Sequence, residues 1–512
     1  MRHRLLGVAV TIALAAAGCG GGSGSGSADD PGAIVPGSAY VYVEANLDPE
    51  GKQQEAARTV LASLPGVGAP ADRLKEQFNA YAQRRYGRAA ARFDRDIEPW
   101  LGERLAAFSL LPRGVRDVDE AATGLIAATR DSEKARHWLF VVSRRSNERQ
   151  RTYKGVRYLW SGGRERVASA VVDGFVVTAD EAAFKAIVDR GSGGSLAERR
   201  RFASAVERAP DERVGLLWYD TRRLVDTVAR RVSAAYLRAA LPAIRRLIPE
   251  EPVVLTVRAK NKSLVMDGAV PAGKGGVLTS LFDEGGSLMD QLPRDAIAVV
   301  GQPNFGNYLR KLLALANVGH GGYRGARAEF RRDGFDIERN LLGWMTDAAV
   351  FLRKDRDGSL GGALIVQSGD ANSVYDGTLR LGRYLFRNGA DVRDVRVPGS
   401  SVSFSVPLKG LRKKLYVAEA GKRMVVAYGA DSVRAAISVG GLGGAPHYEA
   451  ARARLGLDWG PAAYVDIQRL LESLPAGSLG AAKPFLESLR YVIVGGRVDG
   501  KRLRSHTELV VR

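Results

Sequence analysis

The pattern of hydrophobic and polar positions is clearest between residues 212 and 227. There an apolar run is followed by an aspartate, Asp220, and then by apolar residues at helical spacing, in the sequence ERVGLLWYDTRRLVDT. This order predicts a buried strand that passes directly into an amphipathic helix. The pattern recurs at residues 460–473 as GPAAYVDIQRLLES, with Asp466 in the place of Asp220. The chain therefore contains two strand-to-helix junctions of one kind.

Further segments match each other in the same order on both sides of these junctions. An alternating strand pattern opens at Pro36, and a similar one opens at Pro293. Residues 96–102, DIEPWLG, match residues 336–343, DIERNLLG, with their final glycines aligned. Several matched segments in one order indicate a single unit that is written twice.

The remaining strand patterns follow one another through short turns, with matching hairpins predicted at 172–178 and 420–426. Helical stretches do not alternate strictly with the strands, so we predict an α+β fold with mainly antiparallel sheets packed by helices. We assign a first lobe to residues 36–270 and a second lobe to 292–512. A glycine-rich linker at 271–291 is expected to join them.

The N-terminus has the pattern of an export signal. Arg2, His3 and Arg4 precede an apolar run from Leu5 to Ala17. This run is too short to cross a bilayer, for which roughly 20 apolar residues are needed. We therefore expect residues 1–18 to be a signal peptide.

Residues 14–19, LAAAGC, resemble the lipobox of bacterial lipoproteins, in which the cysteine becomes the acylated N-terminus. Cys19 is the only cysteine of the chain, so no disulfide can form within it. We predict that a lipid such as palmitate is attached to Cys19. The alternative is a simple cleaved signal with an incidental cysteine.

Glycine and serine dominate the residues that follow the cysteine, GGGSGSGSADDPG at positions 20–32. Such a composition behaves as a flexible coil, and we assign residues 19–35 to a tether. Its r.m.s. span is roughly 20 Å. The expected location is thus the extracytoplasmic face of the cell membrane, with the lipid anchor in the bilayer.

The chain is strongly basic. Its formal charge is +20, and loss of Arg2 and Arg4 with the signal lowers it by 2, to +18. This surplus would attract the chain to an anionic lipid surface or an anionic wall polymer. The basic residues are scattered along predicted helices, however, so a solvated surface is the favoured explanation of the charge. We expect no nucleic-acid partner, and the identity of any protein partner stays open.

No known catalytic motif stands out. The histidines do not occur at metal-ligating helical spacing, and there is no H-E-x-x-H motif, cysteine cluster or G-x-S-x-G elbow. Residues 268–275, GAVPAGKG, have the start of a phosphate loop but lack the Ser or Thr that must follow its lysine. We therefore predict no catalytic residue, no metal site and no cofactor. The histidines are His3, His137, His320, His447 and His506.

The repeated aspartates are the best polar candidates for a binding site, because each is followed three residues later by an arginine. These pairs are Asp220 with Arg223 and Asp466 with Arg469. A carboxylate that occurs twice at the same structural place could face a shared ligand. The stronger interpretation is a helix N-cap, since aspartate accepts hydrogen bonds from free backbone N–H groups there.

Residues 233–248, SAAYLRAALPAIRRLI, are basic and amphipathic, as a helix lying on a membrane would be. Pro242 would kink such a helix. A single apolar stripe is also what a helix packed on a sheet requires. Both interpretations are kept.

The export signal, the Gly/Ser tether, the opening pattern P-x-x-A and the D-I-E segment together resemble the uncharacterised actinobacterial lipoproteins of the DUF3352 type. The resemblance implies a location and a duplicated α+β architecture, and it carries no known activity. We expect a non-enzymatic envelope lipoprotein that binds a ligand or a partner protein. The alternatives are a hydrolase of cell-wall or lipid material and a structural or assembly factor of the envelope.

Overall fold

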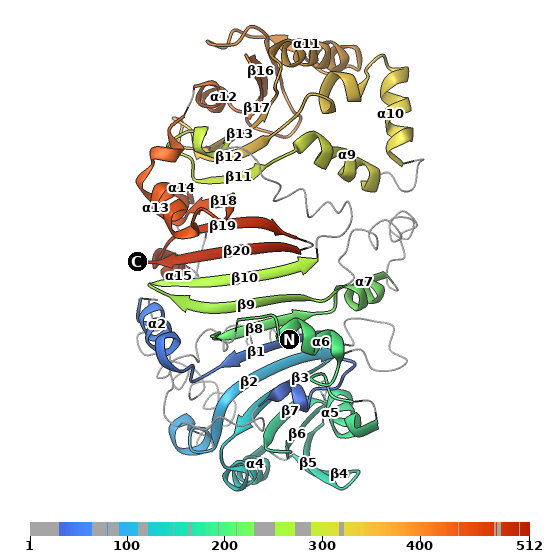
Figure 1. The fold of residues 1–512 in the computed structure, drawn as a ribbon, viewed down its shortest axis with the longest axis vertical. Coiled ribbons are helices and arrows are strands. Elements are labelled where there is room, and N and C mark those ends of the chain that lie inside the picture. Colours follow the sequence, from blue (N-terminus) through green and yellow to red (C-terminus); the bar gives the residue numbers. More distant parts are fainter. Residues whose placement is uncertain are drawn as a thin grey trace. The chain divides into compact units, whose positions relative to one another are not determined.

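The computed structural model describes residues 30–63, 79, 92–110, 121–146, 148–162, 166–192, 194–210, 212–229, 251–271, 288–316, 322–438, 440–475, 478, 483–500 and 502–512. These residues form two compact units. One unit is built on strands β1 to β10 and the other on strands β11 to β20 (Figure 1).

The first unit is organised on an antiparallel sheet. In order across this sheet, the strands are β4 (Arg149–Tyr153), β5 (Val156–Ser161), β6 (Val167–Val172), β7 (Phe175–Asp180), β3 (Ala122–Thr129), β2 (Leu101–Leu110), β1 (Val41–Asn46), β8 (Gly215–Tyr219), β9 (Val253–Lys260) and β10 (Ser263–Pro271). Buried and partly exposed residues alternate along β3. This alternation is what a strand with one face on a core requires.

The helical segments of the first unit connect these strands. They are η2 (Pro31–Ala33), α2 (Gly51–Ala62), η4 (Phe93–Ile97), α4 (Ser132–Ser146), α5 (Glu181–Val188), η6 (Asp189–Ser192), α6 (Arg200–Val206) and α7 (Thr221–Ala229).

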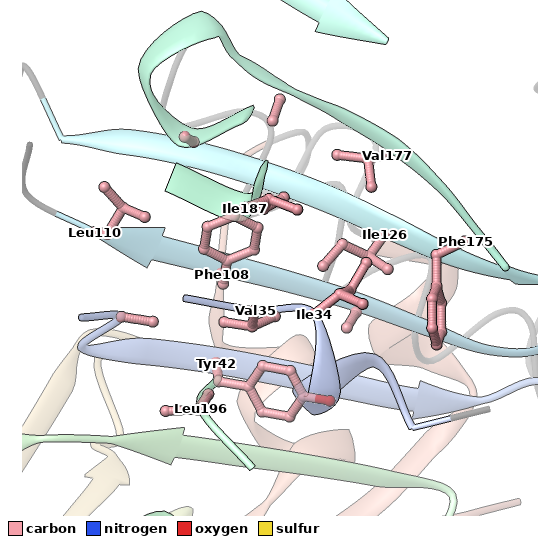
Figure 2. Close-up of a cluster of buried hydrophobic side chains, with 14 of the residues drawn as sticks. Ile34, Val35, Tyr42, Phe108, Leu110, Ile126, Phe175, Val177, Ile187 and Leu196 are labelled. Carbon is pink, nitrogen blue, oxygen red and sulfur yellow. The ribbon is translucent and has the colours of Figure 1, made fainter. Parts of the chain in front are cut away.

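Neighbouring strands contribute the core of the first unit. Figure 2 shows Tyr42 from β1, Phe108 from β2 and Ile126 from β3 in one cluster, with Val35 and Leu196 from the flanking segments. The ring of Tyr42 also meets the edge of another buried ring, with 5.3 Å between the two centroids. Edge-to-face contacts of this kind add to the stabilisation that burial provides.

The second unit is also organised on an antiparallel sheet. Its strands are β14 (Arg393–Asp394), β15 (Ser403–Val406), β16 (Leu415–Ala420), β17 (Arg423–Tyr428), β13 (Leu360–Gln367), β12 (Ala348–Lys354), β11 (Ala298–Gln302), β18 (Gly460–Asp466), β19 (Leu489–Asp499) and β20 (Arg502–Val511), in order across the sheet.

Its helical segments are η8 (Leu288–Gln291), α9 (Phe305–Ala316), α10 (Gly322–Arg332), η9 (Glu338–Leu342), α11 (Ala371–Arg387), α12 (Ala430–Ile437), η10 (Leu442–Gly444), α13 (Pro446–Leu455), α14 (Ile467–Ser473) and α15 (Lys483–Glu487).

Two clusters of buried residues lie against the second sheet. Ala349 and Phe351 of β12 belong to one cluster, which also contains residues of α12 and α13. Ala348 belongs to the other, which contains residues of η9 and α11. Because successive residues of a strand point to opposite faces, this part of the sheet is covered on both faces.

The predicted α+β class is confirmed. The strand order is also the same in the two units, from β4 to β10 in the first and from β14 to β20 in the second. An ancestral duplication stays a prediction, and the matched order is the observation that bears on it.

The folded units begin earlier than the sequence indicated. The composition predicts a tether over residues 19–35, but Ile34 and Val35 are only 2% and 0% exposed and belong to the first core. It also predicts a linker over residues 271–291, but Leu288 and Met289 belong to the core of the second unit. In both places a short apolar segment follows a Gly-rich stretch. The composition averaged over the whole stretch is dominated by glycine, so the apolar segment is not apparent from it.

Each of these early segments is held by a Gly/Ser-rich loop of its own unit. In the first unit, Gly37 N donates to Gly194 O at 3.0 Å and Leu196 N donates to Val35 O at 2.7 Å. The second unit has the same arrangement, because Leu442 N donates to the carbonyl of residue 292 at 3.0 Å. In each unit, the loop therefore holds in place the segment that leads into the first strand.

The predicted match of Gly102 with Gly343 is wrong. Gly102 lies within strand β2, whereas Gly343 ends η9 five residues before β12 begins. The indoles of Trp100 and Trp344 make the corresponding contacts instead. Each donates to the carbonyl of the residue four positions earlier, at 2.7 and 2.9 Å. The two matched segments are short and mostly apolar, so the sequences alone do not determine their alignment to within a residue or two.

Candidate functional site

The strand-to-helix junction of the second unit is centred on Asp466, which ends β18 and precedes α14. Its side chain is 1% exposed. Oδ1 accepts hydrogen bonds from the backbone N–H groups of Gln468 and Arg469, both at 3.1 Å. These N–H groups belong to the first turn of a helix and have no partner within it. Asp466 is therefore the N-cap of α14.

The other carboxylate oxygen of Asp466 has side-chain partners. Nδ1 of His447 lies 3.0 Å from Oδ2, and the Tyr464 hydroxyl donates to the same atom at 3.4 Å. Burial raises the pKa of Tyr464, and the charge of Asp466 raises it further, so the phenol stays protonated and remains a donor. Both oxygens of this carboxylate are thus occupied by groups of the chain itself.

Asp220 has the corresponding position in the first unit, between β8 and α7. It is 4% exposed, and its Oδ1 accepts from the backbone N–H of Arg223 at 3.2 Å. The guanidinium of Arg201 lies 3.3 Å from its Oδ2. The predicted cap geometry is present at both aspartates, and neither carboxylate points into free space.

The two predicted arginines have equivalent roles. The Arg469 guanidinium donates to the carbonyls of Arg294 and Ala296, at 2.6 and 3.3 Å. In the first unit, Arg223 donates to the carbonyls of residues 37 and 39, both at 3.4 Å. Each arginine therefore joins the start of its helix to the segment that leads into the first strand of its unit.

The sequence did not identify Arg201 and His447 as partners of the aspartates. Each precedes its aspartate by 19 positions. Each is also followed by a buried aromatic residue, Phe202 or Tyr448, which packs against an aromatic residue two positions before the aspartate. The common spacing is visible in the sequence, but the residue types differ.

A second polar cluster was also missed. Asp355 is 5% exposed; its Oδ2 accepts from Lys413 Nζ at 2.7 Å and its Oδ1 from Ser432 Oγ at 3.0 Å. Burial alone would lower the pKa of Lys413, but the hydrogen bond and charge of Asp355 outweigh it and raise that pKa. The lysine keeps its proton and cannot serve as a general base. Ser432 is 0% exposed, so its hydroxyl is not an accessible nucleophile.

The structure describes few of the other features that the sequence predicts. Cys19 and residues 233–248 lie outside the described residues. Within the described ranges, His, Cys, Asp and Glu side chains form no group of three that could hold a metal ion. None of the helices described is long and apolar enough to cross a membrane.

Comparison with known proteins gives a family match. The family described as "Protein of unknown function (DUF3352)" matches residues 5–411. No curated protein sequence matches the chain.

Among solved structures, crystal form I of TP0453 matches with 10% identity and a TM-score of 0.25, covering 48% of this chain and 79% of that one. Crystal form III of the same protein covers 80% of this chain and 98% of that one, with 10% identity and a TM-score of 0.16.

Proposed function

We propose that this chain, which belongs to the DUF3352 family of proteins of unknown function, is an exported lipoprotein held at the extracytoplasmic face of the cell membrane by a lipid on Cys19. In this role it is non-enzymatic and binds a ligand or a partner protein in the envelope. The observation that carries the proposal is the position of the single cysteine, between an apolar leader and a Gly/Ser-rich segment.

The early start of the fold supports close attachment. Asp30 caps the short helical segment η2, where its side chain accepts from the backbone N–H of Gly32 at 2.8 Å, and Ile34 and Val35 are already part of the core. Only the residues between Cys19 and Asp30 then separate the lipid from the folded unit. A Gly/Ser-rich chain of that length has an r.m.s. span of roughly 15 to 20 Å. The body would therefore stay within about one domain diameter of the bilayer surface.

The non-enzymatic role is supported by the two polar clusters. The carboxylates of Asp220 and Asp466 are satisfied by helix N–H groups and neighbouring side chains. The cluster of Asp355, Lys413 and Ser432 combines a protonated lysine with a buried hydroxyl. A hydrolase needs an accessible nucleophile next to a base, and neither cluster provides that pair.

Metabolic labelling tests the proposed attachment. Cells that produce the chain are given a labelled fatty acid, and membrane and soluble fractions are compared. The unchanged protein should carry the label and remain with the membrane, and Cys19→Ser should lose the label and leave the membrane fraction. Ser23→Ala is the matched control and should behave like the unchanged protein. Membrane retention of an unlabelled Cys19→Ser chain under high salt would contradict the proposal.

A further inference from the structure

The connection between β15 and β16, residues 407–414, has an unusual composition for an exposed loop. Its sequence PLKGLRKK contains basic residues and leucines but no acidic residue. Leu408 is 38% exposed and Leu411 is 51% exposed. We call these eight residues the basic loop. Neither leucine belongs to the buried clusters of the second unit. Packing in those clusters therefore does not account for an apolar residue at either position.

The tip of the basic loop is an ordered turn. The backbone N–H of Leu411 donates to the carbonyl of Leu408 at 3.1 Å, which closes a β-turn. Gly410 is the third residue of this turn and has φ 84°, a conformation that glycine adopts without strain. The two leucines occupy the first and last positions of the turn, so they are held close to one another.

The root of the basic loop is fixed to the sheet. Lys413 Nζ donates to Asp355 Oδ2 at 2.7 Å and to the carbonyl of Leu360 at 3.3 Å. The backbone N–H of Lys413 donates to the Tyr428 hydroxyl at 3.3 Å. Lys413 is therefore used within the fold, and the loop leaves the sheet from a defined position.

The remaining cations of the loop are Lys409, Arg412 and Lys414, and all three are exposed. Across the part of the chain that the structure describes, no carboxylate forms a salt bridge with any of them. Three exposed positive charges and two exposed leucines thus lie in one loop of eight residues.

The first unit has a connection that corresponds to the basic loop but lacks its leucines. The corresponding connection, between β5 and β6, has the sequence GGRER at positions 162–166. It is shorter, contains no leucine and includes an acidic residue. The leucines of the basic loop are therefore not required by the strand order that the two units share.

We propose that the basic loop is a membrane-contact site for a bilayer rich in anionic phospholipid. Leu408 and Leu411 enter the boundary between headgroups and acyl chains, where apolar side chains gain free energy by leaving water. Lys409, Arg412 and Lys414 remain at headgroup level, where the negative surface potential attracts them. This contact adds to the proposed attachment at Cys19 and does not depend on it.

A fluorophore placed on the turn tests the proposal directly. The change Cys19→Ser gives a full chain without cysteine, in which Leu411→Cys can be labelled at one site with an environment-sensitive dye such as NBD. We expect emission at shorter wavelength and higher intensity with vesicles that contain phosphatidylglycerol. Vesicles of phosphatidylcholine alone should cause little change. Leu457→Cys, at a position that is 102% exposed in the same unit, is the control and should not respond.

Neutralising the charges tests the second half of the proposal. Each basic residue near an anionic surface contributes about a fivefold gain in partitioning, so Lys409→Gln, Arg412→Gln and Lys414→Gln together should lower vesicle binding about a hundredfold. All three side chains are exposed, so the variant should keep its circular dichroism spectrum and thermal midpoint.

Three results would overturn the proposal: no response at position 411 with anionic vesicles, an equal response with zwitterionic vesicles, or an equal response at position 457. Both labelled chains share the same N-terminus, so the leader contributes equally to each. Because both also lack Cys19, such a result would leave the lipid attachment untouched. Failure of fatty-acid labelling would likewise leave the loop contact untouched.

Discussion

His447 and Asp466 make the contact that distinguishes the two junctions: Nδ1 of the histidine lies 3.0 Å from Oδ2 of the aspartate. The corresponding partner of Asp220 is Arg201, at 3.3 Å. One buried carboxylate therefore faces a guanidinium, and the other faces an imidazole. The two units solve one structural problem with different chemistry.

Replacing His447 should have a small effect that depends on the new side chain. His447→Leu removes one donor to Asp466 and should lower the free energy of unfolding by about 0.5 kcal/mol, because the imidazole is half exposed. His447→Arg should restore the loss, since arginine already serves this position in the first unit. Urea unfolding of both variants checks the order. Equal loss in both would show that the contact with Asp466 is not the cause.

Removing the cap at Asp466 should cost more than removing the cap at Asp220. Asp466→Ala leaves two helix N–H groups and the buried Tyr464 hydroxyl without an acceptor, which should cost roughly 3 kcal/mol. Asp220→Ala loses one hydrogen bond from a backbone N–H group, that of Arg223, and should cost about 1 kcal/mol. Hydrogen exchange of the backbone amides in α14 and in α7 measures the effect of each variant on its own unit. Asp376→Ala, at an exposed position of α11, is the control.

The stability of α11 should depend on pH through Asp370. The Ser373 hydroxyl and the backbone N–H groups of Ser373 and Asn372 donate to this carboxylate and lower its pKa. The folded pKa is thus below the unfolded value, so this contribution is present at neutral pH. It is lost as the pH falls below the usual aspartate value of about 3.9 and through the folded pKa.

Asp370→Asn should remove that part of the acid sensitivity. Thermal midpoints measured from pH 7 to pH 3 should differ most between the variant and the unchanged chain at neutral pH, and the two should converge in acid. Asp376→Asn is the matched control on the same helix and should leave the slope unchanged. A constant difference at every pH would show that the charge of Asp370 is not involved.

A methyl group at position 377 should destabilise α11 even though alanine favours helices. A Cβ on Gly377 would contact the carbonyl oxygen of Asn340 and lie 2.9 Å from the indole nitrogen of Trp344. Gly377→Ala should therefore lower the free energy of unfolding by about 1 to 3 kcal/mol. Gly369→Ala, where a Cβ would meet nothing within 4 Å, is the control. Unfolding of both variants in urea measures the difference.

Much of the fold could be predicted because strand period, turn residues and cap residues are local signals. The antiparallel α+β class and the junctions at Asp220 and Asp466 followed from these signals. The partners Arg201 and His447 could not be identified, because contacts across 19 positions depend on how helices pack. The burial of Ile34 and Val35 was also missed, since an apolar segment of two residues shows no periodicity.

The same local reasoning explains why the candidate surface site was missed. The basic loop is short, and its leucines have the spacing that a buried helix turn would also show. Only their exposure in the folded chain distinguishes the two possibilities. The anchoring residue Lys413 likewise resembles its neighbours in sequence, and its partner Asp355, which directly follows strand β12, is distant in the chain.

The way in which the chain enters its first strand has a mechanical consequence. A pull on the N-terminal side of Pro31 acts first on three backbone bonds, from Leu196 to Val35, from Gly37 to Gly194 and from Ala197 to Gly32. These bonds bear the applied force before strand β1 does. The segment that precedes β1 would therefore detach first and protect the sheet of an anchored protein from the force. Single-molecule stretching from residue 30 should therefore show an early, separate extension of roughly 20 to 30 Å, at up to ~3.6 Å per released residue, before the sheet opens.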